Sequence, residues 1–313
     1  MMRCLVTGGA GFIGSHLVHA LAARGLEVRV LDNLSSGTRS NLEGAAAELV
    51  IGDVMDFEAT ASAARGAEVV FHMAAMISVP ASMDDPLRTY RENVLGSLNV
   101  LEAARRAGGR RVVLSSSCAV YGAADHPSAE SDPVQPRSPY AASKVAMEDL
   151  GRLYAEVYRL STVSLRYFNV YGPRQSPASP YAAVIPIFVH EMLEGRSPVI
   201  HGDGEQSRDF VYVDDVVQAN LLAAEAVGDI PGVVNVGTGR ALTIRQLAQA
   251  LAEALPDAPP ATFGPPRPGD LHASRSNPRL AHDKLGFRAA YDLQQGLRHT
   301  VESVRGEKAA PSG

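Results

Sequence analysis

Residues 8–14 read Gly8-Gly9-Ala10-Gly11-Phe12-Ile13-Gly14, between a short apolar run, Cys4 to Thr7, and a segment with helical spacing of apolar residues, Ile13 to Ala23. Glycines in this context permit a tight turn, close approach of the backbone to a pyrophosphate, and close packing of helix on strand. The helix amino terminus adds N–H groups and the positive end of its dipole. The stretch therefore predicts a dinucleotide site at Gly8, Gly11 and Gly14.

A carboxylate completes this fingerprint. Asp32 lies 18 residues after Gly14, at the end of the next apolar run, Glu27 to Leu31. An acid there accepts hydrogen bonds from the adenosine ribose and repels a 2′-phosphate. Asn33 follows and no arginine is adjacent, which favours NAD over NADP. Asp53 is placed to reach the adenine, although an ordinary strand-end carboxylate would have the same spacing.

The rest of the first half repeats the strand-then-helix pattern. Alternation of this kind predicts right-handed βαβ units and a Rossmann-like, doubly wound parallel sheet of the α/β class. Further apolar runs are predicted as strands: Glu48 to Ile51, Val69 to Met73, Arg111 to Ser115 and Thr162 to Arg166. Helical spacing recurs in Leu87 to Ala107 and Tyr140 to Tyr158.

The alternation of predicted strands and helices ends after Asn169, where prolines and glycines divide the chain into short irregular segments. We expect residues 1–170 to form an NAD-binding domain that is rejoined by residues 209–238. Residues 171–208 and 239–305 are expected to form a smaller C-terminal substrate-binding lobe, and residues 306–313 a disordered tail.

The composition bounds the function class. The chain has 313 residues, 29 basic and 34 acidic, a net charge of −5 and no dense basic stretch, which argues against nucleic acid as a partner. No uncharged run reaches the roughly 18 residues of a membrane span, and the first residues do not resemble a signal peptide. The two cysteines are too few for a disulfide framework or a zinc site, so we predict no metal and a reducing cytoplasm.

Tyr140 and Lys144 place a phenol and an ammonium four residues apart on one face of the predicted helix. A neighbouring cation, helped by a positively charged nicotinamide, is expected to lower the phenol's pKa, so that Tyr140 can exchange a proton with a sugar or alcohol hydroxyl. Ser117 ends a predicted strand on the ligand-binding side of the sheet and can share that proton. A hydroxyl that merely caps the strand end would occupy the same place.

Together these motifs resemble the extended short-chain dehydrogenase/reductase family of nucleotide-sugar enzymes, most closely the UDP-hexose 4-epimerases. The resemblance covers nearly the whole chain. It includes the glycine stretch, Tyr140 to Lys144, and further stretches: His72-Met73-Ala74-Ala75, Asn93 to Ser97, Arg166 to Arg174, Arg208 to Asp215 and Arg267-Pro268-Gly269-Asp270.

The resemblance implies roles for individual residues. It makes Tyr140 the catalytic acid/base, Lys144 its electrostatic and ribose-binding partner, and Ser117 a hydroxyl relay. It places NAD against Phe12, Ile13, Asp32, Asn33, Leu34, Ser35, Ser36, Gly37, Asp53, Val54, Ala74, Asn93, Tyr140, Lys144 and Phe168. It places the UDP-sugar substrate against Ser117, Tyr140, Asn169, Arg208, Arg267, Asp270 and Ser274, although the arginines could equally be surface ion pairs.

The implied reaction is oxidation and re-reduction at C4 of a UDP-hexose, with NAD regenerated every turnover. A 4,6-dehydratase is disfavoured, because Cys118 and Ala119 stand where such relatives carry acidic residues. Cys118 is interpreted as a packing residue, since a free cysteine commonly behaves as a small hydrophobe. The resemblance also implies a homodimer built from the helices Leu87 to Ala107 and Tyr140 to Tyr158.

Ser274 stands where a bulky tyrosine restricts some epimerases to glucose and galactose. A serine leaves room for an N-acetyl group, which predicts use of UDP-GlcNAc and UDP-GalNAc as well as UDP-Glc and UDP-Gal. The alternative is that Ser274 only lines a wall of the pocket and that specificity is set elsewhere, for example by the loop Ser176 to Tyr181. Alternative functions are a UDP-glucuronate 4-epimerase, or a regulatory protein that senses NAD or a sugar nucleotide without turnover.

Overall fold

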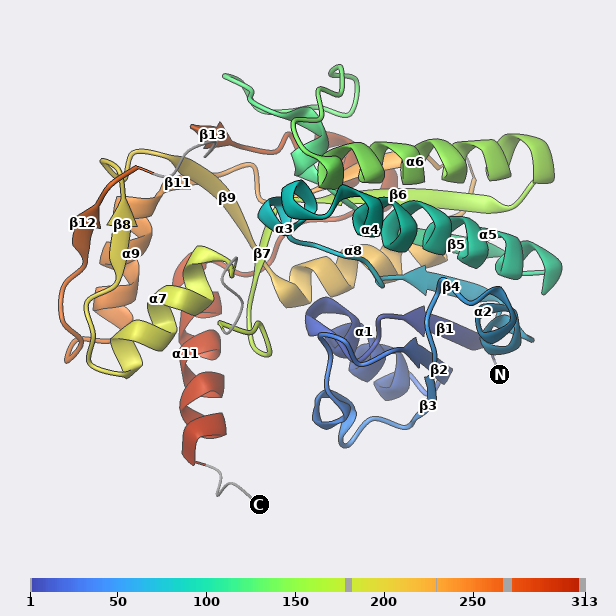
Figure 1. Ribbon diagram of the computed structural model, residues 1–313, viewed down its shortest axis with the longest axis horizontal. Helices are drawn as coiled ribbons and strands as arrows, with labels where there is room; N and C mark the ends of the chain where they lie inside the picture. The colour runs from blue at the N-terminus through green and yellow to red at the C-terminus, as the bar shows by residue number, and fades with distance from the viewer. Residues whose placement is uncertain (1, 178–181, 229, 267–271, 310–313) are drawn as a thin grey trace.

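Seven parallel strands form the central sheet of the computed structural model (Figure 1). The structure describes residues 2–177, 182–228, 230–266 and 272–309, and for residues 307–309 it describes the backbone alone. The order β3-β2-β1-β4-β5-β6-β10 places the reversal of strand order between β1 and β4, where doubly wound sheets bind ligands. The strands are β1 (Arg3–Thr7), β2 (Glu27–Asp32), β3 (Ala47–Ile51), β4 (Val69–His72), β5 (Arg111–Ser117), β6 (Ser161–Tyr167) and β10 (Val233–Val236).

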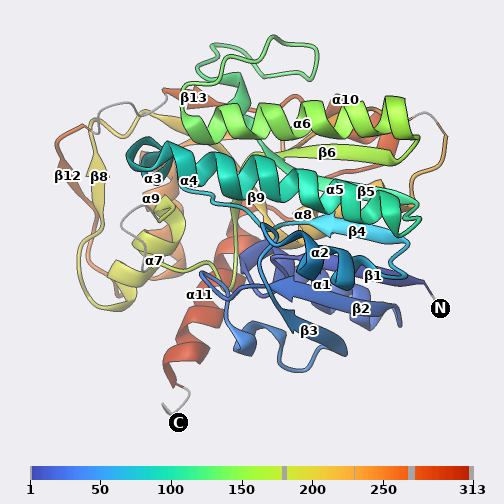
Figure 2. The ribbon, with the colours of Figure 1, turned by 45° about the vertical axis from the view of Figure 1, so that its right-hand side comes forward.

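Helices cover both faces of this sheet, as Figure 2 shows. One face packs against α1 (Phe12–Ala23), α8 (Val213–Glu225) and α10 (Arg279–Leu285), and the other against α2 (Phe57–Ala64), α5 (Gly96–Arg106) and α6 (Pro139–Tyr158). The neighbours Leu5 and Val6 of β1 are both fully buried because they point to opposite faces. Val6 joins the core with Leu17, and Leu5 the core with Leu101. This double burial explains why the strands read as continuous apolar runs.

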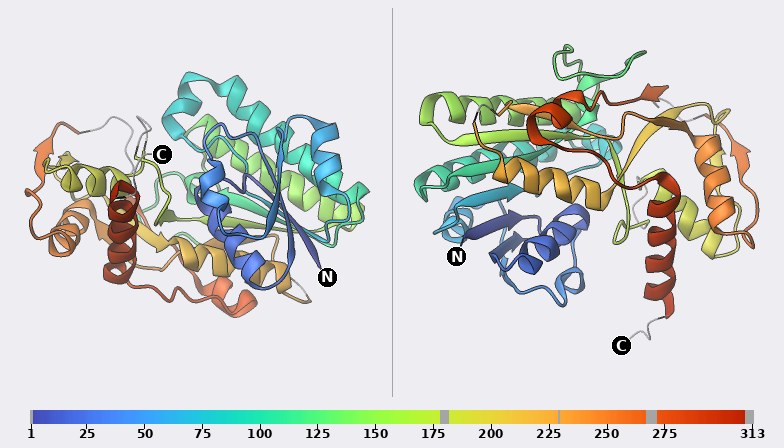
Figure 3. Two further views of the ribbon diagram at one scale, coloured as in Figure 1. Left: turned by 90° about the horizontal axis from the view of Figure 1, so that it is seen from below. Right: turned by 180° about the vertical axis from the view of Figure 1, so that it is seen from behind.

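The remaining strands belong to a smaller lobe, which we define as residues 169–177, 182–212, 241–264 and 273–274 together with α11. One sheet contains β7 (Asn169–Tyr171), β9 (Ser207–Tyr212), β11 (Ala241–Thr243) and β13 (Ala273–Ser274), and a second pairs β8 (Val199–His201) with β12 (Thr262–Gly264). Their core lies under α7 (Val184–Leu193), α9 (Ile244–Ala254) and α11 (Leu293–Ala309). Figure 3 shows this lobe beside the carboxyl ends of the large sheet.

Local sequence signals begin the helices that carry the site. The side chain of Ser138 accepts a hydrogen bond from the Ala141 amide, and Pro139 occupies the first turn of α6. Shorter helical pieces connect the larger elements: η1 (Arg39–Leu42), α3 (Val79–Asp84), α4 (Pro86–Tyr90), the π-helical η2 (Arg91–Leu95) and η3 (Cys118–Tyr121). Among the described residues, no helix is long and apolar enough to cross a bilayer.

The structure confirms the α/β, Rossmann-like sheet that the sequence predicts. The segment boundaries differ in three places. Residues 209–212 lie in β9 of the smaller lobe, and α10 packs on the large sheet although residues 239–305 were expected in the smaller lobe. Residues 306–309 continue α11 rather than forming a disordered tail, while residues 310–313 lie outside the described chain. The functional division into two domains stays a prediction.

Candidate active site

A cavity of about 280 Å³, which we call the sheet cavity, opens at the carboxyl ends of the parallel strands beside the β1–β4 switch point. It contains most residues predicted to bind the cofactor: Gly8, Gly11, Phe12, Ile13, Gly14, Asp32, Asn33, Ser35, Ser36, Asp53, Val54, Ala74, Tyr140, Lys144 and Phe168. Ser117 also lines it. The fold therefore gathers the glycine stretch and the predicted catalytic residues at one site.

The glycine stretch is shaped so that larger side chains do not fit. Gly8 has a φ of +67° and donates its amide proton to the Leu31 carbonyl at 2.8 Å. A Cβ on Gly14 would lie 2.2 Å from the Gly8 oxygen, because the first turn of α1 packs directly against the loop. The helix amino terminus consequently faces the cavity as bare backbone, which suits a pyrophosphate.

Asp32 hydrogen-bonds both the glycine loop after β1 and the turn after β2. Its carboxylate accepts hydrogen bonds from the Ala10 amide at 2.9 Å and the Leu34 amide at 2.8 Å. Each carboxylate oxygen retains a lone pair for a ribose hydroxyl. Among the described lining residues of the sheet cavity, Lys144 is the one basic side chain, and its ammonium is bonded to the Ser115 carbonyl, so no arginine or lysine of the lining lies beside Asp32 to pair with a 2′-phosphate. The lining therefore fits NAD.

Three predicted cofactor residues support the cavity without lining it. Leu34 has a φ of +56° in the turn that Asp32 braces, and Gly37 packs against the Ala10 carbonyl. Asn93 is buried; its amide oxygen accepts from the Met76 amide at 2.8 Å, and its nitrogen donates to Ser143 Oγ at 2.9 Å. Asn93 thereby fixes the loop after β4 against α6.

Asp53 shows both of the roles that its spacing left open. It lines the sheet cavity, and its carboxylate accepts hydrogen bonds from Asn33 Nδ2 and from the Met55 amide, each at 2.9 Å. The sheet cavity is also lined by side chains that no motif pointed to: Ile77, Glu92 and Gln175. Their positions depend on tertiary packing, so no local pattern in the sequence could have found them.

The catalytic candidates meet where β5 ends and α6 begins. Lys144 Nζ donates to the Ser115 carbonyl at 2.7 Å and lies 5.8 Å from the centre of the Tyr140 ring. Ser117 accepts a hydrogen bond from the Ala119 amide at 3.2 Å, so it does cap the strand end, and it also hydrogen-bonds Tyr140. The serine therefore caps the strand end and lies beside the phenol, and its role as a relay stays a prediction.

Burial dominates the protonation of this group. It raises the pKa of Tyr140 to about 12, and the hydrogen bond with Ser117 opposes that rise. Burial also lowers the pKa of Lys144 to about 8, opposed by the charge of Glu148. The prediction that Lys144, helped by a bound nicotinamide, lowers the pKa of Tyr140 stays a prediction, and burial is the largest effect that acts against it.

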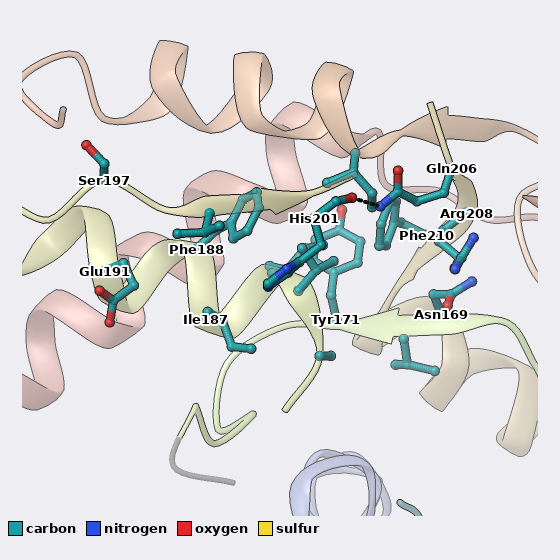
Figure 4. A pocket seen from close by; sticks show the side chains of 16 residues that line it. Asn169, Tyr171, Ile187, Phe188, Glu191, Ser197, His201, Gln206, Arg208 and Phe210 are labelled. Carbon is teal, nitrogen blue, oxygen red and sulfur yellow. Dashed lines mark hydrogen bonds between the residues drawn. The ribbon is translucent and has the colours of Figure 1, made fainter. Parts of the chain in front are cut away.

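A second cavity, of about 550 Å³, lies in the smaller lobe and is called the lobe cavity (Figure 4). Apolar and aromatic side chains, among them Phe188 and Phe210, line it together with the polar groups of Asn169, Gln206 and Arg208. Gln206 Nε2 donates to the His201 carbonyl at 2.8 Å, which fixes that wall. Flat apolar walls with an adjacent arginine suit a nucleobase and its phosphates.

The two cavities adjoin, since Val170 lines both. Ser274 of β13 lies beside η3, the short helix after Ser117, and donates a hydrogen bond to Cys118 Sγ at 3.8 Å. Cys118 packs against the cluster of Val120, Tyr121 and Phe168, and burial raises its pKa to about 11, so it stays a thiol. Of the predicted substrate residues, Arg267 and Asp270 lie outside the described chain, as does most of the loop Ser176 to Tyr181.

Asp209 is an organising residue that the sequence analysis missed. It is fully buried, and its carboxylate accepts hydrogen bonds from the backbone amides and hydroxyls of Thr238 and Ser276 and from the Gly239 amide. It thus ties β9 to the turn after β10 and to the segment after β13. The available signal was an acid directly before the apolar run Phe210 to Val213.

The chain belongs to the NAD dependent epimerase/dehydratase family, whose model matches residues 4–237. It is 45% identical over 313 residues to the UDP-glucose 4-epimerase of Mycolicibacterium smegmatis, covering 97% of this chain and 99% of the relative. The resemblance to the extended short-chain dehydrogenase/reductase enzymes is thereby confirmed, and with it the dependence on NAD.

Two solved structures share the whole fold. The Thermotoga maritima UDP-glucose 4-epimerase with UDP-glucose superimposes with a TM-score of 0.94 at 42% identity, covering 98% of this chain and all of the other. The UDP-N-acetylglucosamine 4-epimerase of Methanobrevibacter ruminantium M1, in complex with UDP-N-acetylmuramic acid, gives a TM-score of 0.93 at 41% identity, covering 98% and 99%.

Proposed function

We propose that this protein is an NAD-dependent UDP-hexose 4-epimerase that interconverts UDP-Gal and UDP-Glc, and also UDP-GalNAc and UDP-GlcNAc. The observation that carries the proposal is the position of Ser117, Tyr140 and Lys144 in the sheet cavity, beside a lobe cavity suited to a nucleotide. Relatives that span the whole chain at above 40% identity are epimerases of both substrate kinds.

The residues divide the work as follows. Tyr140, with its buried hydroxyl beside Ser117, acts in its phenolate form, which Lys144 and a bound nicotinamide would favour. The phenolate takes the proton of the sugar 4-hydroxyl and later returns it. Lys144, fixed on the Ser115 carbonyl, keeps a positive charge near the phenol and is placed to bind the nicotinamide ribose. When bound, NAD supplies a reversible hydride acceptor for C4. The 4-keto sugar must rotate within the pocket between the two hydride transfers, so that C4 takes the hydride back on its other face.

NAD and the UDP-sugar are proposed to bind in different cavities. The Gly8 to Gly14 loop and Asp32 would hold the pyrophosphate and adenosine ribose of NAD. The uridine would lie in the lobe cavity, with Asn169 and Arg208 at its diphosphate end. Arg267 and Asp270 are proposed to complete that end, on the strength of the family motif.

Purified protein incubated with UDP-Gal, UDP-GalNAc and UDP-glucuronate, without added NAD, tests the function. We expect conversion of the first two to their 4-epimers, because Ser274 is small. Conversion of UDP-glucuronate instead would support the alternative epimerase. Failure to convert any of the three, with binding intact, would support a sensor.

Ser274→Tyr provides the matched variant for the substrate range. A tyrosine beside Cys118 would fill the space that the N-acetyl group needs. We expect turnover of UDP-GalNAc to fall about tenfold or more while turnover of UDP-Gal is retained. Equal losses on both substrates would show that Ser274 does not set the range.

A homodimer is part of the proposal. Large apolar side chains are exposed along α3 to α6, among them Met83, Leu87, Leu153 and Val157. Such a patch on neighbouring helices is typical of a subunit interface. Sedimentation velocity should show a dimer that Leu87→Glu with Val157→Glu converts to monomer, whereas Val227→Glu, on a separate loop, should not. A monomeric wild-type protein would exclude the dimer.

A cytoplasmic location is proposed from the state of the two cysteines. Both cysteines are free thiols in the structure, as in a reducing compartment. Cell fractionation with an antibody against the protein would test it. Galactose use and the supply of surface-polysaccharide precursors would require the same reaction.

A further inference from the structure

A buried ion pair lies directly behind the catalytic residues. Glu148 of α6 and Arg166 of β6 form two hydrogen bonds, Arg166 Nε to Oε1 at 2.8 Å and Nη2 to Oε2 at 2.6 Å. Their side chains are 7% and 5% exposed. Ser116 Oγ donates to the same Oε1 at 2.5 Å, and the Arg166 guanidinium lies 4.7 Å from the centre of the Tyr121 ring.

The fold places this ion pair on the same face of α6 as Lys144. Strand register sets Ser116 of β5 opposite Arg166 of β6, and α6 covers the face on which both meet Glu148. Glu148 follows Lys144 by one helical turn, so the two side chains share one face of α6. Buried positive, negative and positive charges therefore stand in succession from Lys144 through Glu148 to Arg166.

The other titratable groups around Lys144 do not balance its charge near neutral pH. Burial raises the pKa of Tyr140 on α6 to about 12 and that of Cys118 on η3 to about 11, and it lowers the pKa of His72 on β4 to about 3, so all three are neutral. Burial likewise raises the pKa of Tyr167 on β6. Glu92 of η2, also in the sheet cavity, is paired with Arg88 at 2.6 Å.

We propose that Glu148 and Arg166 are positioning residues that set the charge of the catalytic lysine: Glu148 is the counter-ion of Lys144, and Arg166 holds that carboxylate in place and limits its pull. An ammonium taken out of water is stable only beside a compensating charge. The bidentate pair fixes the orientation of the carboxylate. The catalytic meaning rests on the proposed function, but the charge relation can be measured without turnover.

The sequence makes that measurement direct, since only three of its 29 basic residues are lysines. In protein labelled with ¹³C-lysine, the three side-chain signals can be titrated by NMR, with Lys144→Arg assigning the buried one. We expect Glu148→Gln to lower the pKa of Lys144, and Arg166→Gln to raise it, each by about one pH unit. Asp149→Asn removes a neighbouring carboxylate of the same helix that is exposed and paired with Arg152, and should leave it unchanged.

Opposite shifts separate an electrostatic role from a structural one, because a loss of packing alone would move both variants in the same direction. The double variant Glu148→Gln with Arg166→Gln removes both members of the ion pair, so neither is left without the other, and it serves if either single variant fails to fold. Its shift should lie between those of the two single variants. Shifts of the same sign, or none, would overturn the inference.

Activity gives a second readout if the wild-type protein is an epimerase. Turnover should fall at high pH as Lys144 loses its proton. Glu148→Gln should move this fall to lower pH and Arg166→Gln to higher pH, with KM for UDP-Gal unchanged in both. An inactive wild-type protein would refute the proposed function and leave the NMR test intact.

Discussion

Tyr140→Phe is expected to slow the conversion of UDP-Gal about a thousandfold, within the range that a positioned acid/base contributes. The ring is buried, and its hydroxyl is the atom that meets Ser117 at the end of β5. Phenylalanine keeps the ring and its packing but removes the proton carrier. The loss should therefore be in kcat rather than in KM.

Product separation after timed incubation measures the rate, and calorimetric titration with UDP-Glc measures binding. Ser117→Ala is the matched comparison; it removes the relay hydroxyl and should cost less, about tenfold. Thermal melting should show that Tyr140→Phe is folded. A variant that keeps more than about a tenth of the wild-type rate would assign the acid/base role to another group.

Lys144→Arg should lose about a hundredfold in turnover although the positive charge is kept. The ammonium is 3% exposed and fits against the Ser115 carbonyl at 2.7 Å. A planar guanidinium is broader, so it would displace the phenol or shift α6. Overpacking of this kind costs about 1–3 kcal/mol of stability, which lowers the melting temperature without unfolding the protein.

Lys284→Arg makes the same exchange at an exposed position of α10 and should leave the rate unchanged. NAD retained after purification, measured from the absorbance of released cofactor, should fall in the Lys144 variant because its ribose contact is altered. A Lys144→Arg enzyme of near-normal rate would show that charge alone, and not the shape of the ammonium, is required.

Local signals in the sequence were sufficient for the large sheet and for much of the site. The glycines before α1, the acid after β2 and the tyrosine and lysine on one face of α6 depend on spacing within a few residues of a turn or helix. Backbone geometry makes these relations nearly independent of the rest of the chain. Their gathering in the sheet cavity followed from the parallel order of the strands.

Contacts between distant segments could not be predicted in this way. The hydrogen bond of Ser274 to Cys118, the five bonds to Asp209 and the pairing of Glu148 with Arg166 join residues on different strands and helices. The return of α10 to the large sheet belongs to the same class. Each requires distant segments of the chain to pack together before the partners meet.

The sequence by itself determined which chemical groups are present and which of them share a turn or a helix face. Only the tertiary structure decided how strongly each is desolvated, and burial raises the pKa of Tyr140 to about 12. The reason is that charge solvation depends on everything packed around a group, including segments more than a hundred residues away, whereas periodicity reports only on near neighbours.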